Sequence, residues 1–426
     1  MQSAESRAIS NETNPVALEA IVKAAETYSI VASEDIIDVR GVKLWAKGQP
    51  VSAALQQRML ERKLRKPLES CLTAEDGVTL FSLSENLEQF LGDGSPIAKG
   101  LQPWAATLSS QLKQIPLHAV AQLMLTTGLA TRPHMIQHAV HAMALVGGMA
   151  AHSTGSNIDI RVAMLAGLLH DIGEIYIQPE YLDRPGQLDL QGHKHLVVHP
   201  RVAQVLLSAT TDYPQILSRA IGEHHERLDG SGYPARAKAN NLSPLGRMLA
   251  VAEVTLGIAR AKSAPMTRTS FALRVVPGEF DLQFAGFICN IARNTPEAVP
   301  EDVLSKPQAP DSHIADITAR NQQLNEVRSQ LIAQQCSQLS LDMTDVAAAR
   351  LQRLQVAWNA LGYWGAQSTE LAPKERMELD MADRELHQRL RELERECLLM
   401  AENLTPEEKT LVSPLWRNLN LDPASA

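Results

Sequence analysis

Histidines are concentrated in one stretch of this sequence, in a pattern typical of metal chemistry. Ten of the thirteen histidines lie between His134 and His225. His134, His138 and His141 follow the spacing i, i+4 and i+7, which predicts that they share one face of a helix. Because each buried imidazole needs a partner, an accumulation of this size indicates a common role.

Further donor residues stand at the ends of other predicted apolar helices. They are His170 with Asp171 after residues 161–169, His199 before Pro200, and His224 with His225. Ligands gathered from four helices are how a helical bundle builds a metal site. A carboxylate such as Asp171 can bridge two cations, and mixed histidine and carboxylate ligation suits Fe, Mn or Zn better than Mg or Ca. His152, His193 and His195 are interpreted as surface or supporting residues.

Composition limits the class of protein. The 426 residues predict two or three domains, and 45% hydrophobic with only 4% aromatic residues favours a mainly helical fold. The net charge of −8 argues against binding of nucleic-acid polymers or anionic membranes, while a metal site could still attract a small anionic ligand. The polar N-terminus, the lack of a long apolar run and four scattered cysteines predict a cytoplasmic protein without a membrane span.

The elements before the histidine-rich stretch predict a small mixed α/β domain over residues 1–125. Residues 14–31 have helical periodicity, residues 38–51 are typical of a short hairpin, and residues 53–66 predict a basic amphipathic helix. This helix is interpreted as a solvated face, with a surface for a partner as the alternative.

The elements after the histidine-rich stretch predict a linker and a helical hairpin. Four prolines between residues 295 and 312 indicate the linker, and residues 314–361 and 374–404 predict two long helices within a domain over residues 313–426. The second helix carries a heptad seam: Leu379, Ala382, Leu386, Leu390, Leu393, Cys397, Met400 and Leu404. An intrachain hairpin and a homodimer seam are equally good interpretations.

Residues 126–294 resemble the HD-GYP family, whose members are HD-superfamily helical bundles associated with hydrolysis of cyclic di-GMP. The pair His170-Asp171, the downstream His199-Pro200 and the run from His224 to Pro234, HHERLDGSGYP, carry this resemblance at the family's spacing. The segment around Arg184-Pro185-Gly186 follows the family pattern as well. A match at this many spaced points is specific.

The resemblance implies a set of functional residues. Metal ligands would be His138, His170, Asp171, His199, His224, His225 and Glu253, with His134 as a ligand of a third metal; Asp171 and His170 would be catalytic; substrate would contact Arg184, Arg227, Asp229, Gly230, Gly232, Tyr233, Pro234 and Lys262. Two divalent metals, Fe or Mn, or three if His134 binds, would activate a bridging water for attack on the phosphodiester.

Four residues depart from the family pattern at these points. Glu174 stands where the family has a lysine, and Glu253 stands where it has an aspartate. His134 replaces a glutamate, and Lys262 replaces an arginine whose fork would grip a phosphate in two places. A carboxylate at Glu174 would repel a phosphate unless it binds metal or pairs with a base.

These observations leave three functional hypotheses. The favoured one is a metal-dependent phosphodiesterase that hydrolyses cyclic di-GMP to linear pGpG, and further to GMP. The alternative is a catalytically weak signalling module that binds metal, a nucleotide or partner proteins through the loop Asp229–Pro234. A generic HD-domain nucleotidase ranks third, because the run from His224 to Pro234 is intact.

Overall fold

The protein is mainly helical, as the sequence predicts. The computed structural model describes residues 13–59, 62–182, 190–260, 264–297, 310–362 and 372–416. The chain divides into two compact units. The first unit is Met1–Gly257 with Phe280–Asn294, and the second unit is Ile258–Glu279 with Thr295–Ala426.

The N-terminal part of the first unit combines two helices with short antiparallel strands. Its elements are α2 (Pro15–Ala24), β1 (Ile30–Ala32), β2 (Ile36–Ile37), β3 (Lys43–Trp45), α3 (Ala53–Met59), η1 (Leu68–Cys71) and β4 (Leu72–Ala74). A hairpin is present, but it begins before the predicted residues 38–51, because β2 pairs with β3; β1 pairs with β4. The helix predicted over residues 53–66 is wrong in its length: α3 ends at Met59, and Leu64 instead forms an isolated bridge with Asp38.

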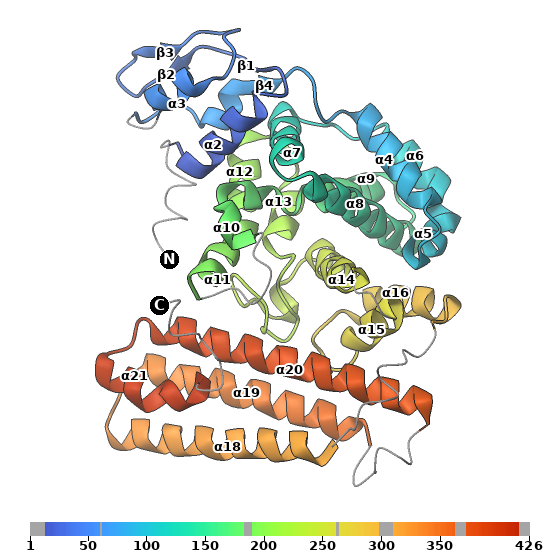
Figure 1. The fold of residues 1–426 in the computed structure, drawn as a ribbon, viewed down its shortest axis with the longest axis vertical. Helices are drawn as coiled ribbons and strands as arrows, with labels where there is room; N and C mark the ends of the chain where they lie inside the picture. Colours follow the sequence, from blue (N-terminus) through green and yellow to red (C-terminus); the bar gives the residue numbers. More distant parts are fainter. Residues whose placement is uncertain are drawn as a thin grey trace. The chain divides into compact units, whose positions relative to one another are not determined.

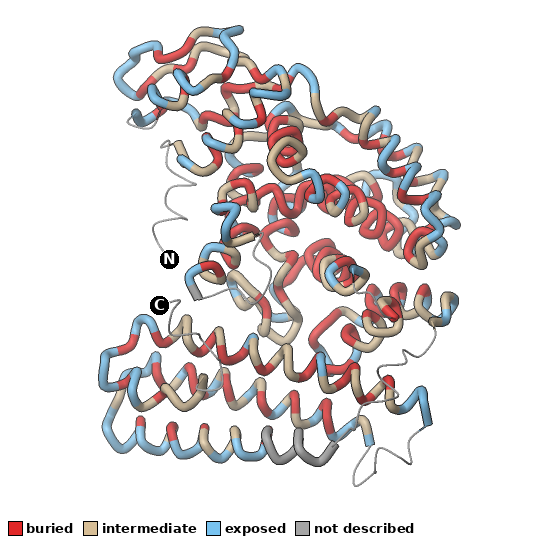
Figure 2. The backbone as a smooth tube through the Cα atoms, in the orientation of Figure 1, coloured by how far each residue is buried: buried red, intermediate tan, exposed pale blue. Residues whose placement is uncertain are grey.

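A group of helices follows and supplies the interior of the first unit. They are α4 (Leu80–Gly92), α5 (Pro96–Leu101), η2 (Gln102–Trp104), α6 (Ala105–Leu112), α7 (Ala119–Thr131), α8 (Pro133–Ser153) and α9 (Asn157–Leu169). Buried positions are concentrated along α8 and α9, the pair in closest contact (Figures 1 and 2). Gly167 permits this contact, because a Cβ there would lie 2.7 Å from the backbone oxygen of Ala142.

The remaining elements of the first unit carry the rest of the donor residues. They are η3 (Ile172–Tyr176), α10 (Pro179–Leu182), α11 (Leu190–Leu196), α12 (His199–Thr210), α13 (Gln215–Gly222), η4 (Ala239–Asn241), α14 (Pro244–Ala259) and α16 (Leu282–Asn294). The start of a helix at His199-Pro200 is confirmed, with the proline in the first turn of α12.

The second unit is built around three long helices that lie side by side in Figure 1. Its elements are α15 (Pro265–Ala272), α18 (Pro310–Ala333), α19 (Gln338–Ala360), α20 (Pro373–Ala401), α21 (Pro406–Val412) and η5 (Ser413–Trp416). The single helix predicted over residues 314–361 is wrong, because Gln335 has a φ of 52° and Ser337 caps a new helix by accepting from the Ser340 amide. The predicted linker lies mostly outside the described residues, and α18 already begins at Pro310.

The heptad seam of α20 packs within this chain. Leu379, Leu386 and Leu393 are 2–5% exposed, and they share one core with residues of α18 and α19. The described residues thus provide an intrachain partner for the seam. Among the helices formed by those residues, none is both long and apolar enough to cross a bilayer.

Candidate metal centre

Seven of the eight residues expected to bind metal come together in the first unit. They form two groups, one of His138, His170, Asp171 and Glu253 and one of Asp171, His199, His224 and His225, with the ligand atoms of each group within 4.8 Å of one another. We call them the first and second metal groups. His134 belongs to neither, since it is exposed at the start of α8.

The first metal group joins the second turn of α8, the end of α9 and the middle of α14. The Nε2 atom of His138 lies 3.2 Å from Nε2 of His170 and 3.1 Å from Oε2 of Glu253. Oδ2 of Asp171 lies 3.1 Å from Nε2 of His170 and 3.4 Å from Nε2 of His138. Two imidazole nitrogens and two carboxylate oxygens thus converge on one point.

The second metal group uses the other oxygen of the same aspartate. Oδ1 of Asp171 lies 3.4 Å from Nε2 of His199 and 3.4 Å from Nε2 of His224. These two Nε2 atoms are 3.1 Å apart, and the His225 ring centroid lies 4.3 Å from that of His224. Asp171 therefore faces each group with a different oxygen, which is the arrangement of a bridging carboxylate.

Backbone carbonyl groups orient three of the imidazoles. Nδ1 of His170 donates to the Gly167 oxygen at 2.8 Å, Nδ1 of His199 to the Leu196 oxygen at 2.7 Å, and Nδ1 of His224 to the Ile221 oxygen at 2.6 Å. Because a carbonyl oxygen only accepts, each Nδ1 carries the hydrogen, and Nε2 of the neutral ring presents a lone pair. Such support from carbonyl groups is typical of histidines that bind metals.

The donor set fits divalent transition metals. Oδ1 of Asp171 is buried and receives no hydrogen bond, although a buried carboxylate oxygen normally has a partner. In their neutral form, His199 and His224 offer it no N–H, because the ring hydrogen is then on Nδ1. A cation between these acceptors would satisfy all of them, and nitrogen–oxygen ligation of this kind suits Fe, Mn or Zn.

The pKa values agree with a site built for cations. Burial alone would lower the pKa of His138, but hydrogen bonds to Asp171 and Glu253 outweigh it and raise the pKa to about 9. Burial alone would raise the pKa of Glu253, yet hydrogen bonds from His138 and His170 hold it well below its usual value. Burial lowers the pKa of His224 and, with His224 as neighbour, lowers that of His225 well below its usual value. His224 and His225 are therefore neutral imidazoles, the form that binds metals.

Gly173 allows the turn after Asp171 to lie against the start of α12. A Cβ at this position would be 2.1 Å from the carbonyl oxygen of His199, a separation that no side chain tolerates. The glycine thus keeps His170 and Asp171 within reach of His199.

The loop that follows His225 is tied to the second metal group. Glu226 is 1% exposed, and its carboxylate accepts from the backbone amides of Ala235 at 2.6 Å and Ala237 at 3.0 Å. Tyr233 stacks on the His225 ring with centroids 4.5 Å apart. Glu226 therefore fixes the loop from its far end, a role that the sequence analysis did not assign.

The residues expected to contact substrate differ in their surroundings. Tyr233 lies next to the second metal group, whereas Arg227 stacks over the Phe280 ring at 4.8 Å. The other loop residues shape the turn. Asp229 accepts from the Ser231 amide at 2.9 Å, and Gly230 has a φ of 79°. A Cβ on Gly232 would lie 2.3 Å from the His225 oxygen, and Pro234 is the last residue of the loop. Arg184 and Lys262 lie outside the described residues.

Glu174 has an arginine partner that the sequence analysis missed. Arg132, between α7 and α8, donates from Nη1 to Oε2 of Glu174 at 3.0 Å, and the two side chains are 14% and 22% exposed. Burial and the neighbouring Asp171 raise the pKa of Glu174. The sequence left two roles for the Glu174 carboxylate, metal binding or pairing with a base. In the structure it is paired with a base, Arg132. Forty-two residues separate the partners, so spacing gave no signal.

Other histidines of the cluster have packing roles in the first unit. His141 stacks on Phe90, His195 stacks on Tyr181, and His152 lies edge-on to Trp104. His193 lies edge-on to Tyr233, 6.4 Å between centroids.

Comparison with known proteins gives the class of this site. Residues 124–269 match the HD domain family. The chain is 26% identical over 209 residues to the 3'3'-cGAMP-specific phosphodiesterase 1 of Vibrio cholerae, covering 49% of this chain and 46% of that protein. It is 35% identical to the cyclic di-GMP phosphodiesterase response regulator RpfG of Xanthomonas campestris, covering 26% and 30% of the two chains, and 31% identical to a cyclic di-GMP phosphodiesterase of Pseudomonas aeruginosa, covering 32% and 33%.

The matched segments span less than half of the length of each of these relatives. A solved structure of Bd1817, an HDG"Y"P protein from Bdellovibrio bacteriovorus, aligns with 62% of this chain and 94% of its own at 16% identity and a TM-score of 0.36. These matches place residues 124–269 in the HD domain family and support the resemblance to HD-GYP proteins that the sequence motifs predict.

Proposed function

We propose that the chain is a metal-dependent phosphodiesterase that hydrolyses a cyclic dinucleotide. The expected substrate is cyclic di-GMP, opened to linear pGpG and then cleaved to GMP. The observation that carries this proposal is the division of the Asp171 carboxylate, with Oδ2 toward His138 and His170 and Oδ1 toward His199 and His224. The names of the relatives from Vibrio, Xanthomonas and Pseudomonas support the choice of substrate class.

In this proposal the residues of the two metal groups would hold two cations, Fe or Mn, and Asp171 would be a ligand in both groups. Bound metals of this kind lower the pKa of a water to near neutrality and stabilise negative charge on a phosphoryl group. The chain's own residues keep the site dry and the ligands oriented: His199 is 1% exposed and His224 is 0% exposed. Since His134 lies outside both groups, the proposal is for two metals and not three.

The loop Asp229–Pro234 is proposed to border the substrate site. Its Tyr233 ring covers one side of His225, and Glu226 holds the loop in that position. Arg184 and Lys262 stay predicted phosphate contacts. The proposed catalytic domain is residues 126–294. Residues 1–125 would form an accessory domain, residues 295–312 a linker and residues 313–426 a helical domain.

The pairing of Glu174 with Arg132 supports a second candidate, a weak enzyme that serves as a signalling module. The pair brings no net positive charge to the metal centre, and it engages the Arg132 guanidinium that could otherwise bind a phosphate. Loss of one such contact would slow hydrolysis by about 30- to 1000-fold without removing the metal ligands. Signalling proteins would then dock at the loop Asp229–Pro234.

The test is hydrolysis by the full chain, purified without oxygen and loaded with Mn²⁺ or Fe²⁺. Cyclic di-GMP and 3'3'-cGAMP are each supplied, and linear products are separated by chromatography. Asp171→Asn serves as the inactive variant, and Asp159→Asn, an exposed aspartate on the preceding helix α9, is the matched control. Linear product from the wild type and Asp159→Asn supports the phosphodiesterase. Binding of either nucleotide without any product would reject it in favour of the signalling module.

A further inference from the structure

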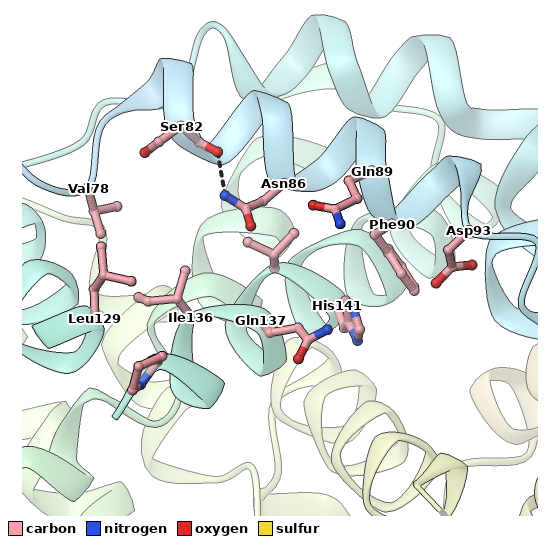
Figure 3. A pocket seen from close by; sticks show the side chains of 12 residues that line it. Val78, Ser82, Asn86, Gln89, Phe90, Asp93, Leu129, Ile136, Gln137 and His141 are labelled. Atoms are coloured by element: carbon pink, nitrogen blue, oxygen red, sulfur yellow. Dashed lines mark hydrogen bonds between the residues drawn. The ribbon is translucent and has the colours of Figure 1, made fainter. Parts of the chain in front are cut away.

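A recess in the first unit lies between α4 and α8, apart from the metal groups. It has a volume of about 280 Å³, and none of the metal-group residues lines it. Gln137 and His141 enter it from α8, on either side of His138 in sequence, while Asn86 and Gln89 enter it from α4 (Figure 3).

The polar part of the recess consists mainly of carboxamides. Asn86, Gln89 and Gln137 surround the same space from both helices in Figure 3. The Asn86 side chain donates one N–H to the Ser82 backbone oxygen at 2.7 Å, whereas neither glutamine side chain makes a hydrogen bond to any described residue. Each carboxamide presents a donor and an acceptor in one plane, the pattern that pairs with the edge of a heterocyclic base.

The apolar part of the recess suits the faces of a flat ring. Leu129, Ile136 and Val140 supply aliphatic surface, and Phe90 stacks on His141 with centroids 3.9 Å apart and the rings 24° from parallel. Together with the carboxamides, these side chains offer surface to a ring's faces and hydrogen bonds to its edge.

Charge and size exclude a nucleotide from this recess. Its lining contains neither lysine nor arginine, and Asp93 is its carboxylate, so a phosphate would be repelled. Pockets for drug-sized ligands enclose roughly 300–1,000 Å³, and about 280 Å³ is the space for one small ring system. We propose that this recess is a binding site for a single uncharged nucleobase-like heterocycle, distinct from the site that would bind a cyclic dinucleotide.

The experiment is calorimetric titration of the full chain with adenine, guanine, cytosine and uracil as free bases, with inorganic phosphate as the negative control. The variants are Gln89→Leu and the double variant Asn86→Leu/Gln89→Leu, whose altered side chains are exposed on α4. Gln57→Leu, an exposed glutamine on α3 outside the recess, is the matched control.

At least one base is expected to bind the wild type and Gln57→Leu equally, and Gln89→Leu is expected to weaken that binding by about tenfold. Hydrogen exchange should then show protection by the base in α4 and α8, a readout that needs no variant. Three results would overturn the proposal: no base binds, binding is unaffected by both α4 variants, or protection appears only elsewhere in the chain.

Discussion

The two units of this protein each bury charged side chains, but they balance the charge in opposite ways. In the first unit, Asp171 and Glu253 face imidazole nitrogens, and Oδ1 of Asp171 receives no hydrogen bond. In the second unit, Glu385 is 3% exposed and accepts from both Arg268 and Arg389, and Arg389 also donates to Glu279.

The difference shows that the cluster of the second unit is structural, whereas the metal groups of the first unit need a bound cation. Burial would lower the pKa of Arg389, but Glu279, Glu392 and Glu385 outweigh it and raise that pKa, so the second unit supplies its own cation. The metal groups bring two carboxylates and five ring nitrogens together, and no lysine or arginine belongs to either group; this convergence of metal-binding donor types is the property that points to metal ions.

The largest effect is expected from loss of the shared carboxylate. Asp171→Asn removes the residue that belongs to both metal groups, so both should lose metal. The loss of hydrolysis should exceed the roughly 10- to 100-fold reduction that follows loss of an outer partner of a ligand. Metal analysis and rate measurements on the variant, beside Asp159→Asn, check this. Normal metal content in Asp171→Asn would show that the aspartate does not bridge.

Loss of Arg389, which pairs with Glu279 and Glu385, should unfold the second unit locally without an effect on metal content. Arg389→Met leaves Glu279 and Glu385 without their shared partner, which should destabilise α20 by about 3–5 kcal/mol. Hydrogen exchange along α20 measures this. The control is Arg384→Met on the same helix, whose side chain is 43% exposed and pairs with Asp380; this change should matter by less than about 1 kcal/mol. Equal exchange in both variants would contradict the distinction between the two arginines.

The Glu174–Arg132 pair is an internally balanced pair within the unit that carries the metal groups, and freeing the arginine should change substrate binding. Glu174→Gln removes the negative charge, and Arg132 should then contact a phosphate and lower KM by about tenfold. The double variant Glu174→Gln/Arg132→Met should lose this gain. An unchanged KM in Glu174→Gln would mean that the pair lies away from the substrate.

A smaller effect is expected where Glu408 accepts from the backbone amides of Ser337 and Thr405 in the second unit. These hydrogen bonds lower the pKa of Glu408 from 4.5 to about 2, and those from Ser337 have the largest effect. A lowered pKa stabilises the fold above pH 4.5, and this contribution is lost as the pH falls toward 2. Glu408→Gln should cost about 1 kcal/mol at pH 7 and progressively less below pH 4.5.

Acid unfolding curves of Glu408→Gln and of Glu407→Gln, the exposed neighbour on α21, measure the difference. A penalty for Glu408→Gln that stays constant down to pH 2 would contradict the role of the ionised carboxylate.

The sequence predicted the parts of the site that depend on local spacing. His138, His170 and His199 stand at helix positions that periodicity and Pro200 indicate, so the four-helix origin of the ligands follows from local rules. The family resemblance added Glu253, which lies 83 residues beyond His170 in the chain. Such a separation carries no local signal.

Contacts formed only on folding could not be predicted. Arg132 reaches Glu174 because α7 ends where α8 begins, and the recess between α4 and α8 depends on packing of helices that are more than forty residues apart. The break at Gln335 was missed because a left-handed non-glycine residue leaves helical composition around it unchanged. His134 shared the spacing of its neighbours, but it lies on the exposed first turn of α8.

The most direct test of the bridging arrangement is the metal content of the full chain purified without oxygen. Two Fe or Mn ions per chain are expected for the wild type, about one for Glu253→Gln, which removes a ligand of the first metal group alone, and close to none for Asp171→Asn. Less than one ion per wild-type chain, or equal contents in Glu253→Gln and Asp171→Asn, would contradict two metal groups that share one aspartate.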